Sequence, residues 1–303
     1  MTHHTRTSRI AALLVASATM IAGAPHPLAF EAAEGPPLWR VGDDDTTIFL
    51  FGLPNLMDGE TQWRTTAFDA ALSQADVVIL EADRSSPEAR MAMQQAAQEL
   101  GIFGDGLTLH DVVGDDLWAR TQALAATLGL PPRALNPLRP WLAANQLQGV
   151  ALQQAGLVGA ESPTAVISAE AASAGTPVTW LEASTTLLHA MGDLPEASQV
   201  RIFRQAIDVL EHDPEAPART LAQWAAGDVD ALAATFHGEG EWADEVVRTA
   251  VLLERNATWQ AQLEEVLTTE TGVYFVAVGI GHLVGDDSLV AALEAAGYPV
   301  ERR

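Results

Sequence analysis

Short, uninterrupted apolar runs near both ends of the chain constrain its fold more than any other feature. Two lie near the N-terminus, at residues 46–52 (TTIFLFG) and 76–82 (DVVILEA), and a third lies near the C-terminus, at residues 272–279 (GVYFVAVG). Apolar runs that do not alternate with polar residues are typical of strands covered on both faces, as in parallel sheets with helical crossovers. The sequence therefore predicts an α/β fold, with a mixed or mostly parallel sheet built from both chain ends.

Helical patterns fill most of the sequence between these ends. Apolar residues recur at helical spacing over 65–75, 110–130 and 138–157, and a proline-rich turn separates the last two stretches. One further strand is predicted at 176–183. We therefore expect a single domain over residues 31–303, with a large helical insertion at about 106–267.

The C-terminal segment predicts a closing helix and strand. The helix is expected over 288–296, with Asp286 or Asp287 as its N-cap and Gly297 as its terminator. A short strand, 298–302, is expected to follow it.

The first thirty residues are interpreted as a signal peptide. Arg6 and Arg9 precede an apolar run, 10–24, that is short for a membrane span and rich in alanine and glycine. The alternative is a helix that stays attached as an anchor. No later segment reaches the roughly 20 apolar residues that a span needs. We expect an exported protein, periplasmic or extracellular, without an integral membrane segment after cleavage.

The charge balance limits the possible partners and chemistries. The chain has 40 acidic and 16 basic residues, for a net charge of −24, and every basic residue is arginine. Such a protein repels phosphate backbones and anionic lipids, so nucleic acids and membrane surfaces are poor partners. The absence of lysine excludes a phosphate-binding loop, and the absence of cysteine excludes disulfides and thiolate metal sites.

Three predicted strands are followed by polar residues that carry useful chemistry. Asn55 follows the first strand, Glu81 ends the second, and His282 follows the strand near the C-terminus. In open α/β sheets, ligands bind at the carboxyl ends of the strands, where these residues would meet. Each also has a simpler interpretation: a turn asparagine, a glutamate that caps a helix or pairs with arginine, and a structural histidine.

At these residues the sequence resembles the TraB/GumN family, which is related to the Tiki metalloproteases and PrgY. The resemblance runs from about residue 38 to 300, through VILEAD, GTPVTWLEA, ERNATW and FVAVGIGHLVGDD. It implies two Gly-x-x-His motifs and a glutamate that form a divalent-metal site for peptide hydrolysis in the Tiki branch. By position, Gly279 with His282 is the second motif, and Glu81 is the glutamate. Arg255 and Asn256 match an Arg-Asn-x-x-Trp pattern that would orient the site or a substrate carbonyl, or would serve helix packing.

The first motif departs from the family pattern, because Asn55 stands where the resemblance predicts a histidine. Hydrolytic sites that use zinc, cobalt or manganese need about three protein ligands and one open position for water. An amide oxygen is a weak ligand for these metals, so Glu81, His282 and Asn55 would make a poor site. Histidines of the helical middle would help only if that part folds over the sheet edge; they are His110, His189, His212 and His237.

Two hypotheses about function follow. In the first, the protein is a metal-dependent hydrolase acting on peptides. The sequence favours it slightly, because Glu81, His282, Arg255 and Asn256 are retained. In the second, it is a catalytically inactive relative that binds a peptide or protein partner in the same cleft. The first hypothesis predicts that Asn55→His raises the affinity for a divalent metal.

Overall fold

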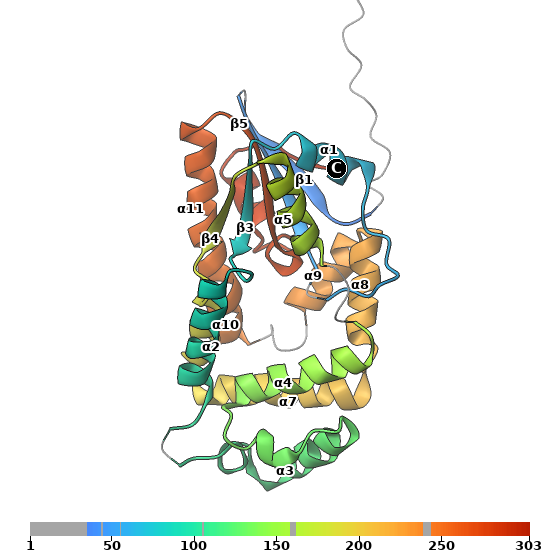
Figure 1. The fold of residues 1–303 in the computed structure, drawn as a ribbon, viewed down its shortest axis with the longest axis vertical. Helices are drawn as coiled ribbons and strands as arrows, with labels where there is room; N and C mark the ends of the chain where they lie inside the picture. The colour runs from blue at the N-terminus through green and yellow to red at the C-terminus, as the bar shows by residue number, and fades with distance from the viewer. Residues whose placement is uncertain (1–34, 44, 55, 105, 158–161, 239–243) are drawn as a thin grey trace, which may run out of the picture. The chain divides into compact units, whose positions relative to one another are not determined.

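Six strands form one sheet in the computed structural model, in the order β4-β3-β5-β2-β1-β6 (Figure 1). The structure describes residues 35–303 except 44, 55, 105, 158–161 and 239–243, so the predicted signal peptide lies outside the described residues. The strands are β1 (Leu38–Gly42), β2 (Thr46–Leu53), β3 (Val77–Ala82), β4 (Val178–Glu182), β5 (Gly272–Gly279) and β6 (Val300–Arg302).

The sheet is mixed and mostly parallel, as predicted. β4, β3, β5 and β2 run parallel, whereas β1 is antiparallel to both of its neighbours, β2 and β6. Strand β5, from the C-terminal part of the chain, lies between β2 and β3 from the N-terminal part, since Tyr274 pairs with both Ile48 and Val77. β1 was not predicted, because Arg40 interrupts its short apolar run. The guanidinium of Arg40 donates to the Thr47 hydroxyl on β2 at 3.0 Å.

An aromatic core joins the sheet to its helices. The Phe51 ring on β2 lies 4.8 Å from the Phe68 ring on helix α1, and Phe68 lies 5.6 Å from Phe275 on β5. The other helices that contribute buried residues to this core include α5, α8, α9, α11 and α12. Their bounds, with that of α1, are α1 (Thr66–Ser73), α5 (Pro163–Ala174), α8 (Ala216–Ala226), α9 (Val229–His237), α11 (Glu254–Thr269) and α12 (Leu289–Ala295).

The predicted cap of the last helix was wrong. Neither Asp286 nor Asp287 caps α12; Ser288 does, and its hydroxyl accepts the Ala291 N–H at 3.1 Å. The carboxylate of Asp287 is instead paired with Arg248 at 2.8 Å. Gly297 follows the helix with a φ of +97°, as expected of a terminating glycine.

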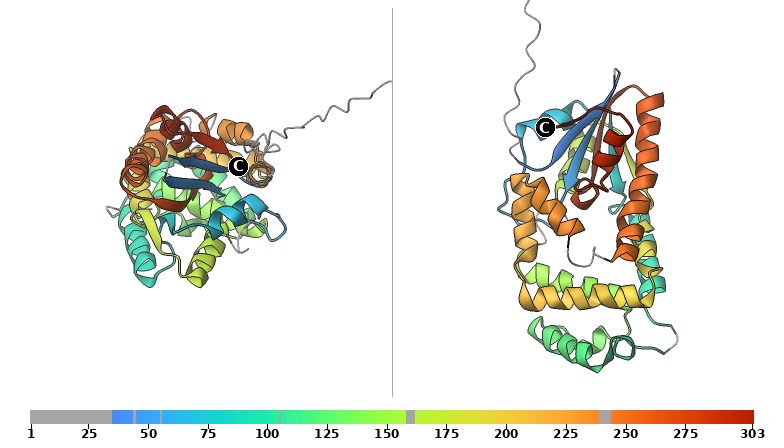
Figure 2. Two further views of the ribbon diagram at one scale, coloured as in Figure 1. Left: turned by 90° about the horizontal axis from the view of Figure 1, so that it is seen from above. Right: turned by 180° about the vertical axis from the view of Figure 1, so that it is seen from behind.

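A second hydrophobic core lies within the helical part of the chain. It is built mainly by α3 (Leu109–Thr127), α4 (Pro140–Gln154) and α7 (Glu196–His212). Figure 2 shows α4 and α7 side by side, with α3 next to them. The remaining helical segments are α2 (Pro87–Gly101), η1 (Pro132–Ala134), α6 (Thr186–Gly192), α10 (Glu245–Arg248), η3 (Thr249–Leu253) and η4 (Ile280–His282). In the part of the chain that the structure describes, no helix has both the length and the apolar character needed to cross a bilayer.

Candidate functional site

The carboxyl ends of three parallel strands bring acidic and histidine side chains together. Glu81 lies near the end of β3, Glu182 ends β4, and β5 ends at Gly279, directly before the η4 turn that carries His282. The Gly279 N–H donates to Oε2 of Glu81 at 3.1 Å, although 198 positions separate the two residues. Parallel strands that pair side by side end at the same edge of the sheet, which explains this convergence.

Glycines allow the η4 turn to pack closely against its neighbours. A β-carbon on Gly52 of β2 would lie 2.4 Å from Cδ1 of Ile280, and one on Gly281 would lie 3.1 Å from the Phe236 ring of α9. The Gly52 carbonyl also accepts a hydrogen bond from the Trp224 indole at 2.7 Å. Gly52 is the glycine of the first motif, in which Asn55 replaces the histidine. Its packing against Ile280 gives Gly52 a structural role that does not depend on a metal.

Arg255, near the start of α11, lies at the centre of the site. Its Nε and Nη2 donate to the two oxygens of Glu182 at 2.9 and 2.7 Å, and Nη2 also donates to Oε1 of Glu81 at 2.8 Å. Its Nη1 donates to the Val251 carbonyl at 2.9 Å and to Nε2 of His282 at 3.0 Å. The side chains of Arg255, Glu182 and Glu81 are only 6%, 7% and 14% exposed. The guanidinium therefore links both buried carboxylates and the imidazole.

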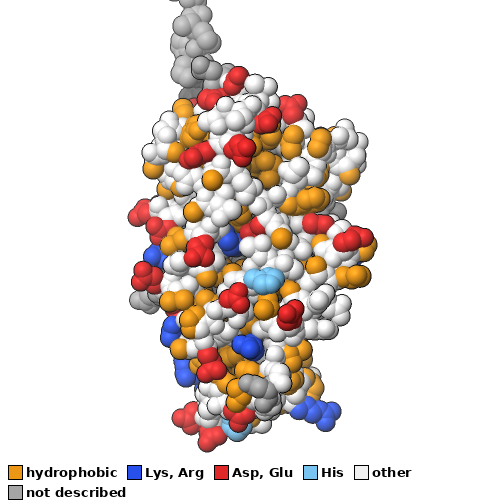
Figure 3. All heavy atoms as spheres, turned by 90° about the vertical axis from the view of Figure 1, so that its left-hand side faces the viewer, with side chains coloured by type: hydrophobic (Ala, Val, Ile, Leu, Met, Phe, Trp, Pro, Cys, Tyr) orange, Lys and Arg blue, Asp and Glu red, His pale blue; other side chains and the backbone are white. Residues whose placement is uncertain are grey.

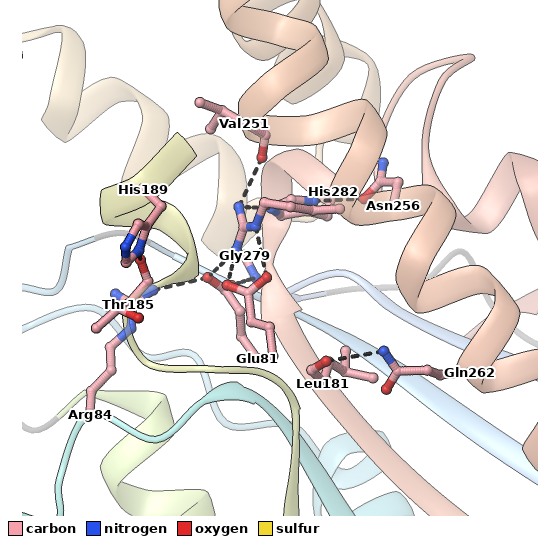
Figure 4. Close-up of polar contacts among 12 residues, drawn as sticks. Glu81, Arg84, Leu181, Thr185, His189, Val251, Asn256, Gln262, Gly279 and His282 are labelled. Atoms are coloured by element: carbon pink, nitrogen blue, oxygen red, sulfur yellow. Dashed lines mark hydrogen bonds and ion pairs between the residues drawn. The ribbon is translucent and has the colours of Figure 1, made fainter. Parts of the chain in front are cut away.

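These contacts fix the protonation state of His282. Because the Arg255 guanidinium can only donate, Nε2 of His282 accepts, and the ring proton lies on Nδ1, which donates to the Asn256 side-chain oxygen at 2.6 Å. The Asn256 amide nitrogen donates in turn to the Asp287 carbonyl at 3.1 Å. Burial, followed by the charge of Arg255, lowers the pKa of His282 to about 3. His282 is thus a neutral imidazole whose two nitrogens are both used (Figure 4).

The indole of Trp259 packs against both His282 and Arg255. Its ring centroid lies 4.4 Å from that of His282, and Cζ of Arg255 lies 4.7 Å from the indole centroid. Trp259 is one turn along α11 from Arg255, so the Arg-Asn-x-x-Trp pattern places all three side chains at one site.

Glu81 remains ionised despite its burial. Burial by itself raises the pKa of this carboxyl, but the positive charges of Arg255 and Arg84 and the Gly279 N–H together hold the pKa below its ordinary value. Arg84 donates to Oε1 of Glu81 at 2.9 Å, and its own side chain is 55% exposed. Glu81 therefore connects the buried network to the surface, where Figure 4 shows Arg84 beside Thr185 and His189.

The structure brings together four of the five residues that the sequence singled out: Glu81, His282, Arg255 and Asn256. The fifth, Asn55, lies outside the described residues. Glu182 was missed. It ends its strand in WLEA as Glu81 ends its strand in ILEA, and this repeated strand-end glutamate is the signal that could have found it.

The four histidines of the helical part occupy separate places. His110 stacks on Trp118 of α3, His189 on α6 donates from Nδ1 to the Thr185 carbonyl, and His212 ends α7. His237 ends α9, and its ring packs against Gly285, three residues after His282. Both nitrogens of His237 are buried and have no hydrogen-bond partner among the residues that the structure describes. The helical part therefore does reach the strand ends, through the end of α9.

As arranged, the strand-end residues do not fit a transition metal. The imidazole lone pair of His282 already accepts from Arg255, and the positive guanidinium is bonded to both carboxylates. Among the described residues, one group of three ligand-type side chains is close enough to hold an ion: Asp208, Glu211 and His212 on α7. Arg120 already pairs with Asp208 and Glu211 there, both at 2.5 Å. That group lies on α7, and none of its three residues takes part in the strand-end network of Glu81 and His282.

Comparison with known proteins adds one finding to this geometry. A family model described as the TraB/PrgY/gumN family matches residues 37–302, nearly the whole chain. No curated protein and no solved structure matches the chain.

Proposed function

This chain belongs to the TraB/PrgY/gumN family, and we propose that it binds a peptide or protein partner at the carboxyl edge of its sheet without hydrolysing it. One observation carries the proposal. The guanidinium of Arg255 lies between Glu81, Glu182 and His282, where a metal held by these residues would have to lie.

The chemistry of the three groups supports this conclusion. A metal ligand must have a free lone pair. The one lone pair on Nε2 of His282 already accepts a hydrogen bond from Arg255. A divalent cation placed beside a fixed guanidinium would also be repelled by it, and the repulsion is strong where water is excluded. Asn55 supplies an amide where the family pattern supplies an imidazole, which weakens any metal site further.

The position of the network supports a binding role. It lies at the carboxyl ends of parallel strands, the usual ligand site of open α/β sheets. Arg84 is exposed beside Glu81, and its guanidinium can donate to the carbonyl or carboxylate groups of a polypeptide. The net charge of −24 argues against nucleic acid and anionic membrane as partners. The N-terminal sequence supports action outside the cytoplasm, in the periplasm or the exterior.

A metal-dependent peptidase using manganese, cobalt or zinc is the second candidate function. Its support is that Glu81, His282 and Asn256 lie at one site, as the family pattern implies. This function requires Arg255 to leave both Glu81 and Nε2 of His282. If that rearrangement takes place, Glu81 and His282 would hold the metal, and the metal would activate water for attack on the peptide bond.

A peptide mixture separates the two functions. The chain from residue 31 onward is incubated with peptides from a casein digest and with manganese, cobalt or zinc, and the peptides are analysed by mass spectrometry. We expect unchanged peptide masses, and retention of a subset of peptides on the immobilised protein. Cleavage products that disappear in the His282→Ala variant would contradict the proposal and favour the peptidase.

A further inference from the structure

The two edges of the sheet are protected very differently. At one edge, β6 has three residues, Val300–Arg302, and two of them are charged. At the other edge, β4 has five residues, and its first four, VTWL, carry no charge. Short length and charged side chains are the usual protection against the addition of another strand. β4 lacks both.

The outer side of β4 presents backbone groups that β3 does not use. The Val78 N–H of β3 donates to the Pro177 carbonyl at 2.9 Å, and Leu80 lies opposite Trp180 in the register. In a parallel pair, alternate residues of a strand direct both backbone groups toward the same neighbour. The N–H and C=O groups of Val178 and Trp180 therefore point away from β3, and in the described part of the chain no strand lies beyond β4.

Trp180 gives this edge an apolar anchor. Its side chain is 47% exposed, although tryptophan is highly buried on average, and Thr179 beside it is exposed too. Exposed tryptophans that stand next to free strand edges supply large, rigid contact area to a binding partner.

The elements beside β4 carry acidic charge. α11 is fixed against the strand by the Gln262 side chain, which donates to the Leu181 carbonyl at 3.1 Å. Glu265, one turn further along α11, is exposed on the same side of that helix. The charged side chains of α11 that reach solvent are all glutamates, because Arg255 is buried. Figure 3, which looks onto the side where α11 and β4 lie, shows acidic side chains interspersed with hydrophobic ones and with several arginines.

We propose that the outer edge of β4 receives an extended, positively charged segment of a partner protein as an added strand, anchored on Trp180. This inference goes beyond the proposed function, because it assigns a partner of stated chemistry to the outer edge of β4 rather than to the strand ends. The backbone groups of Val178 and Trp180 would pair with the added strand. A lysine or arginine of that strand would lie against the Trp180 indole and near the glutamates of α11. A second copy of this chain fits poorly, because both copies would bring the same glutamates and a net charge of −24 to the contact.

The test uses three synthetic peptides of ten residues. The first alternates lysine with valine, the second alternates glutamate with valine, and the third repeats the first with N-methyl groups on alternate amides along one edge. Binding is measured by anisotropy of a fluorescent label, and hydrogen exchange of the Val178 and Trp180 amides is followed by NMR. We expect the lysine peptide alone to bind and to slow exchange at both amides.

Matched variants assign the binding to this edge. Trp180→Ala is expected to weaken binding of the lysine peptide by about tenfold or more. Trp118→Ala removes a tryptophan from α3 and is expected to change nothing, and Glu265→Arg is expected to weaken binding. The proposal is overturned if the glutamate or N-methylated peptide binds equally well, or if Trp180→Ala binds normally. It is also overturned if sedimentation shows a dimer of this chain that Trp180→Ala abolishes.

The two proposals fail in different ways. Cleavage of the lysine peptide by a His282-dependent reaction would contradict the proposed function but leave strand addition intact. Binding of peptides that is independent of Trp180 would contradict strand addition and leave the proposed function intact.

Discussion

Arg255 differs from most arginines of this protein because its charge is paired in the interior. Arg219, for comparison, pairs with Asp213 at 2.5 Å on the surface, where its side chain is 56% exposed. Exposed pairs contribute little to stability, whereas removing one partner of a buried pair leaves an uncompensated charge in a poorly solvated place. In this protein two carboxylates, Glu81 and Glu182, share the one buried guanidinium of Arg255.

Replacing Arg255 should therefore lower the stability of the folded protein strongly. We expect Arg255→Ala to lower the free energy of unfolding by about 3–5 kcal/mol, as is usual when a buried charge loses its partner. Arg255→Lys should recover only part of this loss, because one ammonium cannot donate to Glu182 through two parallel bonds. Urea unfolding monitored by circular dichroism gives the values. The matched surface variant Arg219→Ala should unfold like the wild type, and an equally mild effect of Arg255→Ala would mean that the pairs are not formed in solution.

The neutral state of His282 predicts a pH dependence. Burial and Arg255 lower its folded-state pKa to about 3, while in the unfolded chain histidine titrates near 6.5. The unfolded state therefore takes up the proton first as the pH falls. Stability that is complete above about pH 6.5 is lost progressively toward about pH 3.

His282→Gln isolates this contribution. Between about pH 7 and pH 4.5, the free energy of unfolding of the wild type should fall by roughly 2–3 kcal/mol more than that of the variant, since one pKa unit corresponds to about 1.4 kcal/mol. Urea unfolding at a series of pH values measures both curves. Parallel curves would show that His282 is not held neutral by its surroundings.

At the scale of residues, the sequence predicted most members of the site but not the role of Arg255. Glu81, His282, Arg255 and Asn256 could be named because each follows or matches a recognisable pattern at a strand end or on a helix. The role of Arg255 could not be named, because Glu81 and Glu182 lie on two different strands and His282 lies on the turn after a third. Only the folded sheet shows that one guanidinium bonds to all three.

At the level of elements, uninterrupted apolar runs were reliable signals, and β5 has the predicted bounds, Gly272–Gly279. β1 was missed because Arg40 breaks its pattern. The cap of α12 was assigned to an aspartate because aspartates precede the helix, but Asp287 is paired with Arg248 and Ser288 is the residue next to the first turn. Local propensity ranks candidate caps, whereas tertiary contacts decide among them.

The contact between β2 and η4 gives a prediction about elements. A β-carbon on Gly52 would lie 2.4 Å from Cδ1 of Ile280, so we expect Gly52→Ala to destabilise the protein by about 1–3 kcal/mol through overpacking. Ile280→Val removes that terminal carbon. In the double variant the combined loss should be smaller than the sum of the two single losses, because the clash is gone. Additive losses measured by urea unfolding would contradict the packing role of Gly52.

At the scale of the whole molecule, the sheet depends on both chain ends. β5 lies between β3 and β2, so the strand-end site cannot form until β5 is in place. The sequence predicted this origin of the sheet, because apolar strands occur at both ends and helices between them. The order of the strands and the antiparallel direction of β1 depend on pairing between distant segments, which no local pattern encodes.

The N-terminal sequence predicts that the mature protein is shorter than the gene product. We expect expression of the full chain in a Gram-negative host to yield periplasmic protein that begins between residues 25 and 31. Intact mass measurement of the fractionated protein gives the cleavage point. Arg6→Glu with Arg9→Glu should hold the full-length chain in the cytoplasm, and a retained N-terminus in the wild type would favour the anchor instead.

Calorimetric titration with manganese, cobalt and zinc tests the central claim most directly. The proteins compared are the chain from residue 31 onward, its His282→Ala variant, and the His212→Ala variant that disrupts the group on α7. We predict no binding that depends on His282, while any weak binding should be lost in His212→Ala. Micromolar or tighter binding, about −8 kcal/mol, that disappears in His282→Ala would contradict the account and make Arg255 a displaceable group at a working metal site.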